Sequence, residues 1–253
     1  MPELTRRTSL TAIAIGLIAG ILAGMFGVGG GFIMVPLFVM WLKSERKIAH
    51  ATSLAAVVPI ALSAAIGYAL HGQVDWTAAA FVLSGSVFGA LYGVKLLSTL
   101  PVRTLQLVFS ALLFISAIRL LWSEQPHQLF TGLTADVLLV VIGFAAGVMA
   151  GLLGVGGGIV IVPALIISSG LDAATARGTS LAVIIGTGIS GTIANIRKGN
   201  VNLGIAFMTG IAGIPGTLIG VYLSNVLPEK VTVQLFASLL IAIALKQLPK
   251  ESH

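Results

Sequence analysis

Apolar runs long enough to cross a lipid bilayer recur along this chain, and they constrain its fold more than any other feature. Six runs of about 18–22 residues cover 52–70, 76–97, 101–122, 178–195, 203–223 and 229–246. A helix needs roughly 20 apolar residues to cross the hydrocarbon core of a bilayer. Only 9% of the residues are charged, far fewer than in an ordinary soluble domain. The sequence therefore predicts an all-α integral membrane protein.

Two further apolar stretches, at about 9–42 and 134–168, are broken by clusters of glycine. The first reads GMFGVGGGFIMVP over residues 24–36, and the second reads GLLGVGGGIVIVP over residues 151–163. One constant offset thus takes Gly24 to Gly151 and Pro36 to Pro163. Glycine and proline recurring in register are much harder to obtain by chance than shared apolar residues, so the motifs indicate an internal repeat.

The same offset relates other polar positions of the two halves. It takes Thr52-Ser53-Leu54 to Thr179-Ser180-Leu181 without a gap. We therefore expect one membrane domain over 1–253, in which repeat one covers 9–122 and repeat two covers 136–249.

The 14 Lys and Arg residues predict how the repeats are oriented. If each glycine-broken stretch crosses the membrane once, seven of these residues lie on each side. If each stretch returns to the side from which it entered, eleven lie inside and three outside. Because positive residues concentrate on the cytoplasmic side, the second arrangement is favoured. Each repeat then has an odd number of full crossings, and the repeats are inverted.

The predicted fold class is therefore two inverted repeats, each with a glycine-broken, re-entrant-like helical element plus three transmembrane helices. The arms 31–42 and 158–168 have about 12 and 11 residues, which is too short to cross the core of a bilayer. Both termini are expected in the cytoplasm, and the chain is expected to be a multi-pass protein of the cell inner (plasma) membrane.

The glycine motifs are the main candidates for a binding site. Consecutive glycines are poor helix formers, and they leave backbone N–H groups without the partners of a continuous helix. A helix that restarts at membrane depth also presents a positive N-terminus, which suits an anion in a transporter with broken helices. The candidate substrate-binding residues are Gly29, Gly30, Gly31, Thr52, Ser53, Gly156, Gly157, Gly158, Thr179 and Ser180.

Simpler roles compete with this interpretation. The glycines could only allow close helix packing. Thr52-Ser53 and Thr179-Ser180 are expected to start the helix after each broken stretch, where their hydroxyls could serve as N-caps instead of ligands. His50 and Arg177 occupy equivalent positions of the repeats, and both are interpreted as loop residues rather than as a gate.

Several classes of function are disfavoured by the composition. The chain has no cysteine, and its four histidines lack metal-ligand spacing, so no metal or other cofactor is expected. The eight carboxylates fall in loops or near helix ends, which leaves no intramembrane relay of the kind that a proton pump needs. No nucleophile and base converge, so the chain is not expected to be an enzyme. The basic residues are scattered, which argues against nucleic acid as a partner.

The paired motifs, Gly24 to Pro36 with Thr52-Ser53-Leu54 and Gly151 to Pro163 with Gly178-Thr179-Ser180-Leu181, resemble those of the TauE/SafE family of sulfite exporters, or TSUP-type permeases. The resemblance implies a plasma-membrane transporter, often linked to sulfite, sulfoacetate or related organosulfur anions. One departure is that His50-Ala51 stands where the second copy has Arg177-Gly178, which puts strict symmetry of the site in doubt.

The sequence thus predicts a secondary transporter, or permease, of small anions, with sulfite or an organosulfonate as the substrate class and alternating access between the inverted repeats. The two glycine breaks are expected to meet near the middle of the membrane and to bind the anion through backbone N–H groups. The alternative is a channel-like or sensory membrane protein without coupled transport. The expected partners are a small-molecule anion and the lipid bilayer, and the sequence is compatible with a homo-oligomer.

Overall fold

The computed structural model describes residues 5–96 and 133–247, with six single residues between these ranges. The regular structure of this part is entirely helical. The helices are α1 (Arg6–Phe26), α2 (Gly31–Trp41), α3 (Arg46–Leu70), α4 (Trp76–Leu96), α6 (Leu133–Leu153), α7 (Gly158–Ser169), α8 (Ala173–Arg197), α9 (Leu203–Val226) and α10 (Glu229–Gln247). The crossing expected at 101–122 lies, apart from the six single positions, outside the described residues.

Six of these helices, α1, α3, α4, α6, α8 and α9, are long and apolar enough to cross a membrane. The expected crossing at 229–246 forms helix α10, which is not one of the six. Charged residues at both ends, Glu229, Lys230 and Lys246, confine its uncharged part to 231–245. Helix α10 as a whole has 19 residues, which lies within the roughly 17–25 residues of known crossings.

The glycine clusters separate a long helix from a short one in each half, as predicted. Helix α1 ends where Gly27 adopts a φ of 74°, and α2 starts after Gly30, whose φ is 76°. In the second half, α7 starts after Gly157, whose φ is 84°. One constant offset, the one that relates the two glycine motifs, also takes the first residues of α1, α2, α3 and α4 to those of α6, α7, α8 and α9. The repeat in the sequence is therefore also a repeat of helices.

Helices α3 and α8 begin earlier than expected, which corrects the interpretation of Thr52 and Thr179 as N-caps. The N-cap residues are Glu45 and Asp172, and the carboxylate of Asp172 accepts hydrogen bonds from the N–H groups at the start of α8. Both threonines lie in the second turn. The apolar pattern missed the first turn of α3 because its charged side chains are exposed, as they are where a helix leaves the lipid.

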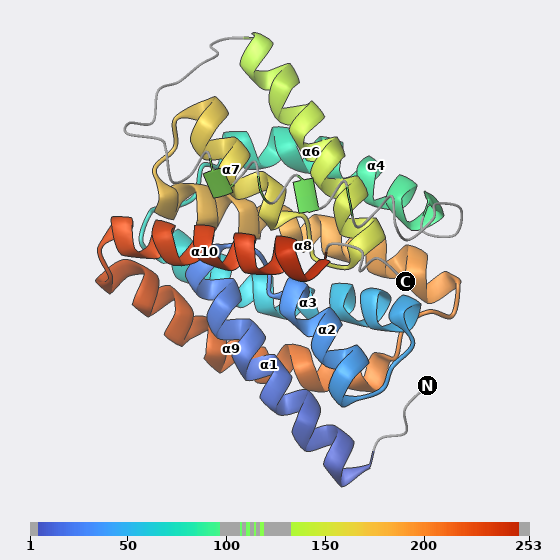
Figure 1. Cartoon of the computed structure of the whole chain (residues 1–253). Coiled ribbons are helices and arrows are strands. Elements are labelled where there is room, and N and C mark those ends of the chain that lie inside the picture. Colours follow the sequence, from blue (N-terminus) through green and yellow to red (C-terminus); the bar gives the residue numbers. More distant parts are fainter. Residues whose placement is uncertain are drawn as a thin grey trace.

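The long helices pair across the two halves, with α1 along α9 and α6 along α4 (Figure 1). Three glycines on α1 face three backbone carbonyls on α9 in the same order along both helices, so the two helices run parallel. The pairs are Gly16 with Thr209, Gly20 with Gly213, and Gly24 with Thr217. On α4, Gly85, Gly89 and Gly93 face Val140, Phe144 and Val148 of α6 in the same way.

Helices α3 and α8 contact one another, and they run antiparallel. The Cα of Gly188 faces Val58, whereas that of Gly191, further along α8, faces Leu54. About half of each helix is buried, and the buried face includes fully enclosed alanine, valine and isoleucine side chains. They therefore place equivalent positions of the two halves around one shared centre.

Candidate functional site

The two glycine breaks meet each other, as the sequence led us to expect. The Cα of Gly31 packs against the backbone of Gly154 and Val155. In the equivalent contact, a methyl group on Gly158 would lie 2.7 Å from the carbonyl oxygen of Gly27 and from the Cα of Val28. Glycine is required at these two contacts because a side chain on either residue would push the breaks apart.

Both breaks hold buried N–H groups that find no acceptor in the described part of the chain. Residues 28–32 are all buried, and so are residues 155–159. The first N–H groups of α2 that reach an acceptor are those of Ile33 and Met34, which both donate to the carbonyl of Gly30. The N-caps Gly30 and Gly157 have no side chain to help. Buried backbone donors normally have a hydrogen-bond acceptor, so a bound ligand could serve as the acceptor here.

Apolar side chains surround these donors. Val57 of α3 and Ile184 of α8, which occupy equivalent positions, are the side chains closest to Gly29 and also to Gly156. Val57 and Ile184 are fully buried. A polar ligand here would lose its water, so hydrogen bonds from the backbone would count for more than they do in an aqueous site.

Each break also receives a hydroxyl from the other half of the chain. Ser180 of α8 donates to the carbonyl of Gly27 at 2.8 Å. Ser53 of α3 lies 2.8 Å from the carbonyl of Gly154 and 2.9 Å from that of His50. Both predicted serines therefore contact the breaks, and each fastens a helix of one half to the glycines of the other.

The two predicted threonines are engaged elsewhere. The hydroxyl oxygen of Thr179 accepts the N–H of Asp75 at 2.9 Å, and that of Thr52 accepts the N–H of Asn202 at 3.0 Å. Asp75 and Asn202 directly precede α4 and α9. The geometry therefore favours a role for the threonines in holding the starts of α4 and α9 against α8 and α3.

His50 and Arg177 are not loop residues, which corrects the sequence interpretation. Each is the fifth residue of its helix, α3 or α8. The Nδ1 atom of His50 lies against the carbonyl of Leu153 at the second break. The stem of Arg177 packs on Gly27 at the first break, and its side chain is only 2% exposed.

A buried polar cluster that the sequence did not reveal surrounds Arg177. Its Nη1 donates to Ser224 at 2.7 Å and its Nη2 donates to Thr232 at 3.0 Å. Tyr68 donates its hydroxyl hydrogen to Ser224 or to the carbonyl of Gly24. These residues come from α3, α8, α9 and α10, so no local motif could have assembled them.

The described carboxylates lie at or near helix starts, as predicted. Glu45 and Asp172 are N-caps, Asp136 and Glu229 lie in first turns, and Asp75 caps α4 by accepting the N–H of Ala78. Among the described residues, no group of three or more His, Asp or Glu side chains could hold a metal ion.

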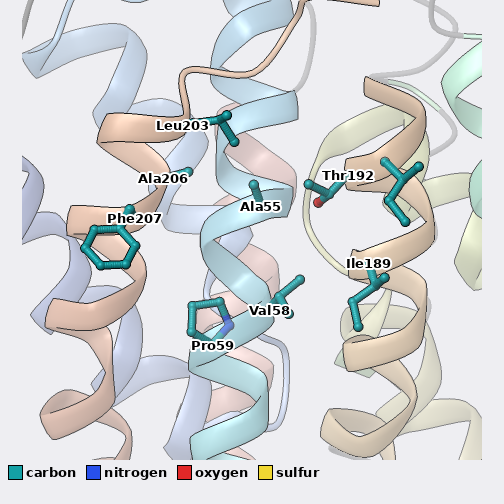
Figure 2. A pocket seen from close by; sticks show the side chains of 9 residues that line it. Ala55, Val58, Pro59, Ile189, Thr192, Leu203, Ala206 and Phe207 are labelled. Carbon is teal, nitrogen blue, oxygen red and sulfur yellow. The ribbon is translucent and has the colours of Figure 1, made fainter. Parts of the chain in front are cut away.

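A separate groove of about 420 Å³ lies between α3, α8 and α9 (Figure 2). Apolar side chains line it, including Val58, Pro59 and Phe207, and Thr192 contributes the one hydroxyl. None of the glycine-break residues lines this groove. It is therefore not part of the candidate anion site.

Comparisons with known proteins find a family and several relatives for this chain. The family model described as "Sulfite exporter TauE/SafE" matches in two segments, residues 2–120 and 139–253. The chain is 28% identical over 224 residues to the probable membrane transporter protein YdhB of Bacillus subtilis, covering 87% of this chain and 91% of that protein.

Two other relatives have similar descriptions. A probable membrane transporter protein of Haemophilus influenzae is 26% identical over 268 residues, covering 95% of this chain and 98% of that protein. The probable membrane transporter protein MJ0441 of Methanocaldococcus jannaschii is 27% identical over 213 residues, covering 82% and 79%. No solved structure matches the chain at a significant level.

Proposed function

Because the chain belongs to the sulfite exporter TauE/SafE family, which consists of membrane transporters and not of enzymes, we propose that it is a secondary transporter of small anions. Sulfite or an organosulfonate is the proposed substrate class. The proposed location is the cell inner (plasma) membrane, with both termini in the cytoplasm. The positions of the positive residues support this orientation.

We further propose that the halves 9–122 and 136–249 are inverted repeats. Two observations support the relation. The first residues of equivalent helices are related by one constant offset, and α3 runs antiparallel to its counterpart α8. In such transporters the site lies where the repeats meet, at discontinuous helices near the middle of the membrane.

One observation carries the proposed anion site, namely that the two breaks meet and bring buried N–H groups without protein acceptors to one place. The donors are the backbone groups around Gly29, Gly30 and Gly31 and around Gly156, Gly157 and Gly158. Helices α2 and α7 add the positive ends of their dipoles. Ser53 and Ser180 hold the breaks in place from the opposite half. An oxyanion offers several acceptor oxygens, which matches a site built from many donors.

Alternating access would then open the site to one side of the membrane at a time. Polar backbone at membrane depth is tolerated where it lines a cavity or is buried in protein. The residues of both breaks are buried in this structure, and we propose that this is the closed conformation of the cycle.

The test is counterflow of radiolabelled sulfite in proteoliposomes that contain the purified chain. A transporter gives saturable uptake that unlabelled sulfite on the opposite side accelerates. Sulfoacetate as a competitor separates sulfite from organosulfonate selectivity. Single-channel currents, or flux that rises linearly with concentration, would refute coupled transport and favour the channel-like alternative.

A further inference from the structure

The guanidinium of Arg177 is a buried positive charge whose direct partners are all neutral. It donates to the hydroxyls of Ser224 and Thr232, and its Nε has no hydrogen-bond partner among the described residues. None of the described residues places a carboxylate oxygen within 4.0 Å of it. Burying an unpaired charge is costly, and proteins usually compensate it with an opposite charge.

The two carboxylates whose charges act on Arg177 from a longer distance are already engaged. Asp172 accepts the N–H groups of Ala174 and Thr175, and Glu229 accepts the N–H of Ala173. Both therefore cap the start of α8. Neither carboxylate forms an ion pair with Arg177, so the guanidinium lacks a direct counter-charge among the described residues.

The position of Arg177 shows which ligand could supply that charge. A methyl group on Gly27 would lie 2.6 Å from the Cα of Arg177, so the residue lies directly against the first glycine break. Ser180, one turn further along α8, donates to the carbonyl of the same Gly27.

We propose that Arg177 is an anion-binding residue that pairs directly with the transported oxyanion beside the first break, and that only this half has such a residue. The planar guanidinium suits two oxygens of a sulfite, a sulfonate or a carboxylate group. The hydroxyls of Ser224 and Thr232 hold the guanidinium in the closed conformation and release it to the oxyanion when the site opens. This inference rests on the proposed transport function.

The other half lacks the same charge. At the equivalent position, His50 directs Nδ1 to the carbonyl of Leu153, so one ring nitrogen is occupied by protein. A permanent positive charge therefore stands at the break formed by Gly27 to Gly30 and not at its counterpart. The anion would bind more tightly on the side of Arg177, which gives the two directions of transport different apparent affinities.

The test compares Arg177→Met with Arg197→Met in the purified full chain. Arg197 lies on the same helix but at its exposed end, so the control removes the same charge outside the site. Sulfite binding is measured by calorimetry in detergent. We expect Arg177→Met to weaken sulfite binding by about tenfold or more, as loss of a charge-assisted hydrogen bond does, and Arg197→Met to leave it unchanged. Sulfoacetate and acetate, titrated in parallel, show whether the site prefers sulfite, sulfonate or carboxylate groups.

Arg177→Lys keeps the positive charge but loses the planar guanidinium, which can donate to two oxygens at once. We expect this variant to bind sulfite with intermediate affinity. The Arg177→Lys variant also tests the proposal if the Arg177→Met protein does not fold. A folded Arg177→Met protein with wild-type affinity overturns the inference, and so does an Arg177→Lys protein with wild-type affinity if only that variant folds. If the wild-type chain itself neither binds nor transports any of these anions, the proposed function fails before the variants are compared.

Discussion

The hydroxyl of Ser180 lies 2.8 Å from the carbonyl oxygen of Gly27, and so joins helix α8 to the glycine break of the other half. Replacing Ser180 with alanine removes this bond and leaves a buried carbonyl without its partner. We expect Ser180→Ala to destabilise the protein by about 1 kcal/mol and to weaken sulfite binding, because the break is held less firmly. Thermal unfolding in detergent, with and without sulfite, measures both effects.

The matched control is Ser238→Ala, since Ser238 is exposed and bonds only within its own helix. It should change neither property. If Ser180→Ala behaves like Ser238→Ala in both measurements, the bond to Gly27 has no role in the site.

Gly30→Ala and Gly157→Ala should abolish transport. A methyl group at Gly30 would lie 2.6 Å from the carbonyl oxygen of Ala19, and one at Gly157 would lie 2.8 Å from that of Ala146. Both positions also have positive φ, which strains any residue except glycine. The added methyl therefore displaces the short helix from the long one and moves the N–H groups out of position.

Gly72→Ala separates the effect of backbone strain from that of displacing a neighbouring helix. Gly72 has a φ of 70°, but a methyl group there would meet no atom within 4 Å. We expect it to cost about 1 kcal/mol of stability and to retain transport. Sulfite affinity and monodispersity are measured on the same samples. Normal affinity in well-folded Gly30→Ala and Gly157→Ala proteins would argue against backbone donors as the anion site.

Thr179→Val should act on stability. The hydroxyl oxygen of Thr179 accepts the N–H of Asp75, and valine would leave that donor without its acceptor. We expect a loss of about 1–3 kcal/mol, with sulfite affinity unchanged in the folded fraction. Thr11→Val is the control, because the hydroxyl of Thr11 bonds within its own helix, far from the breaks. A large loss of sulfite affinity in Thr179→Val without a change in stability would show that Thr179 contacts the anion.

Glu45→Cys and His71→Cys test the orientation in the membrane. The chain has no cysteine of its own, and both positions are exposed. The eleven-to-three distribution of positive residues places Glu45 inside and His71 outside. An impermeant thiol reagent added to intact cells should label His71→Cys, and Glu45→Cys only after the cells are opened. Labelling of Glu45→Cys in intact cells would exclude the proposed inverted arrangement.

Much of the fold could be predicted because apolar length and glycine position are local properties. The constant offset between the halves, the breaks around Gly27–Gly30 and Gly154–Gly157, and their meeting could all be anticipated. The starts of α3 and α8 could not, since Arg46 and Arg177 interrupt the apolar pattern without interrupting the helices. Hydropathy counts a charged residue as exposed whether it lies at the surface or, like Arg177, in the interior.

The partners of the small residues were also beyond the sequence. Gly16, Gly20 and Gly24 have the spacing that brings membrane helices into close contact, but the pattern does not say which helix they meet. Similarly, Tyr68, Ser224 and Thr232 gather around Arg177 from helices far apart in the chain. Such clusters depend on the tertiary arrangement, and a single sequence carries no local sign of them.

Helix α1 of the first half packs mainly against α9 of the second half, and α6 of the second half packs mainly against α4 of the first. The two halves therefore exchange helices, as the subunits of a domain-swapped dimer do. The glycines that contact backbone carbonyls across these pairs would face lipid in an isolated half. A polypeptide cut between α4 and α6 would therefore yield two fragments that are insufficient alone and complementary together. Activity should be recovered only when both fragments are made in the same membrane.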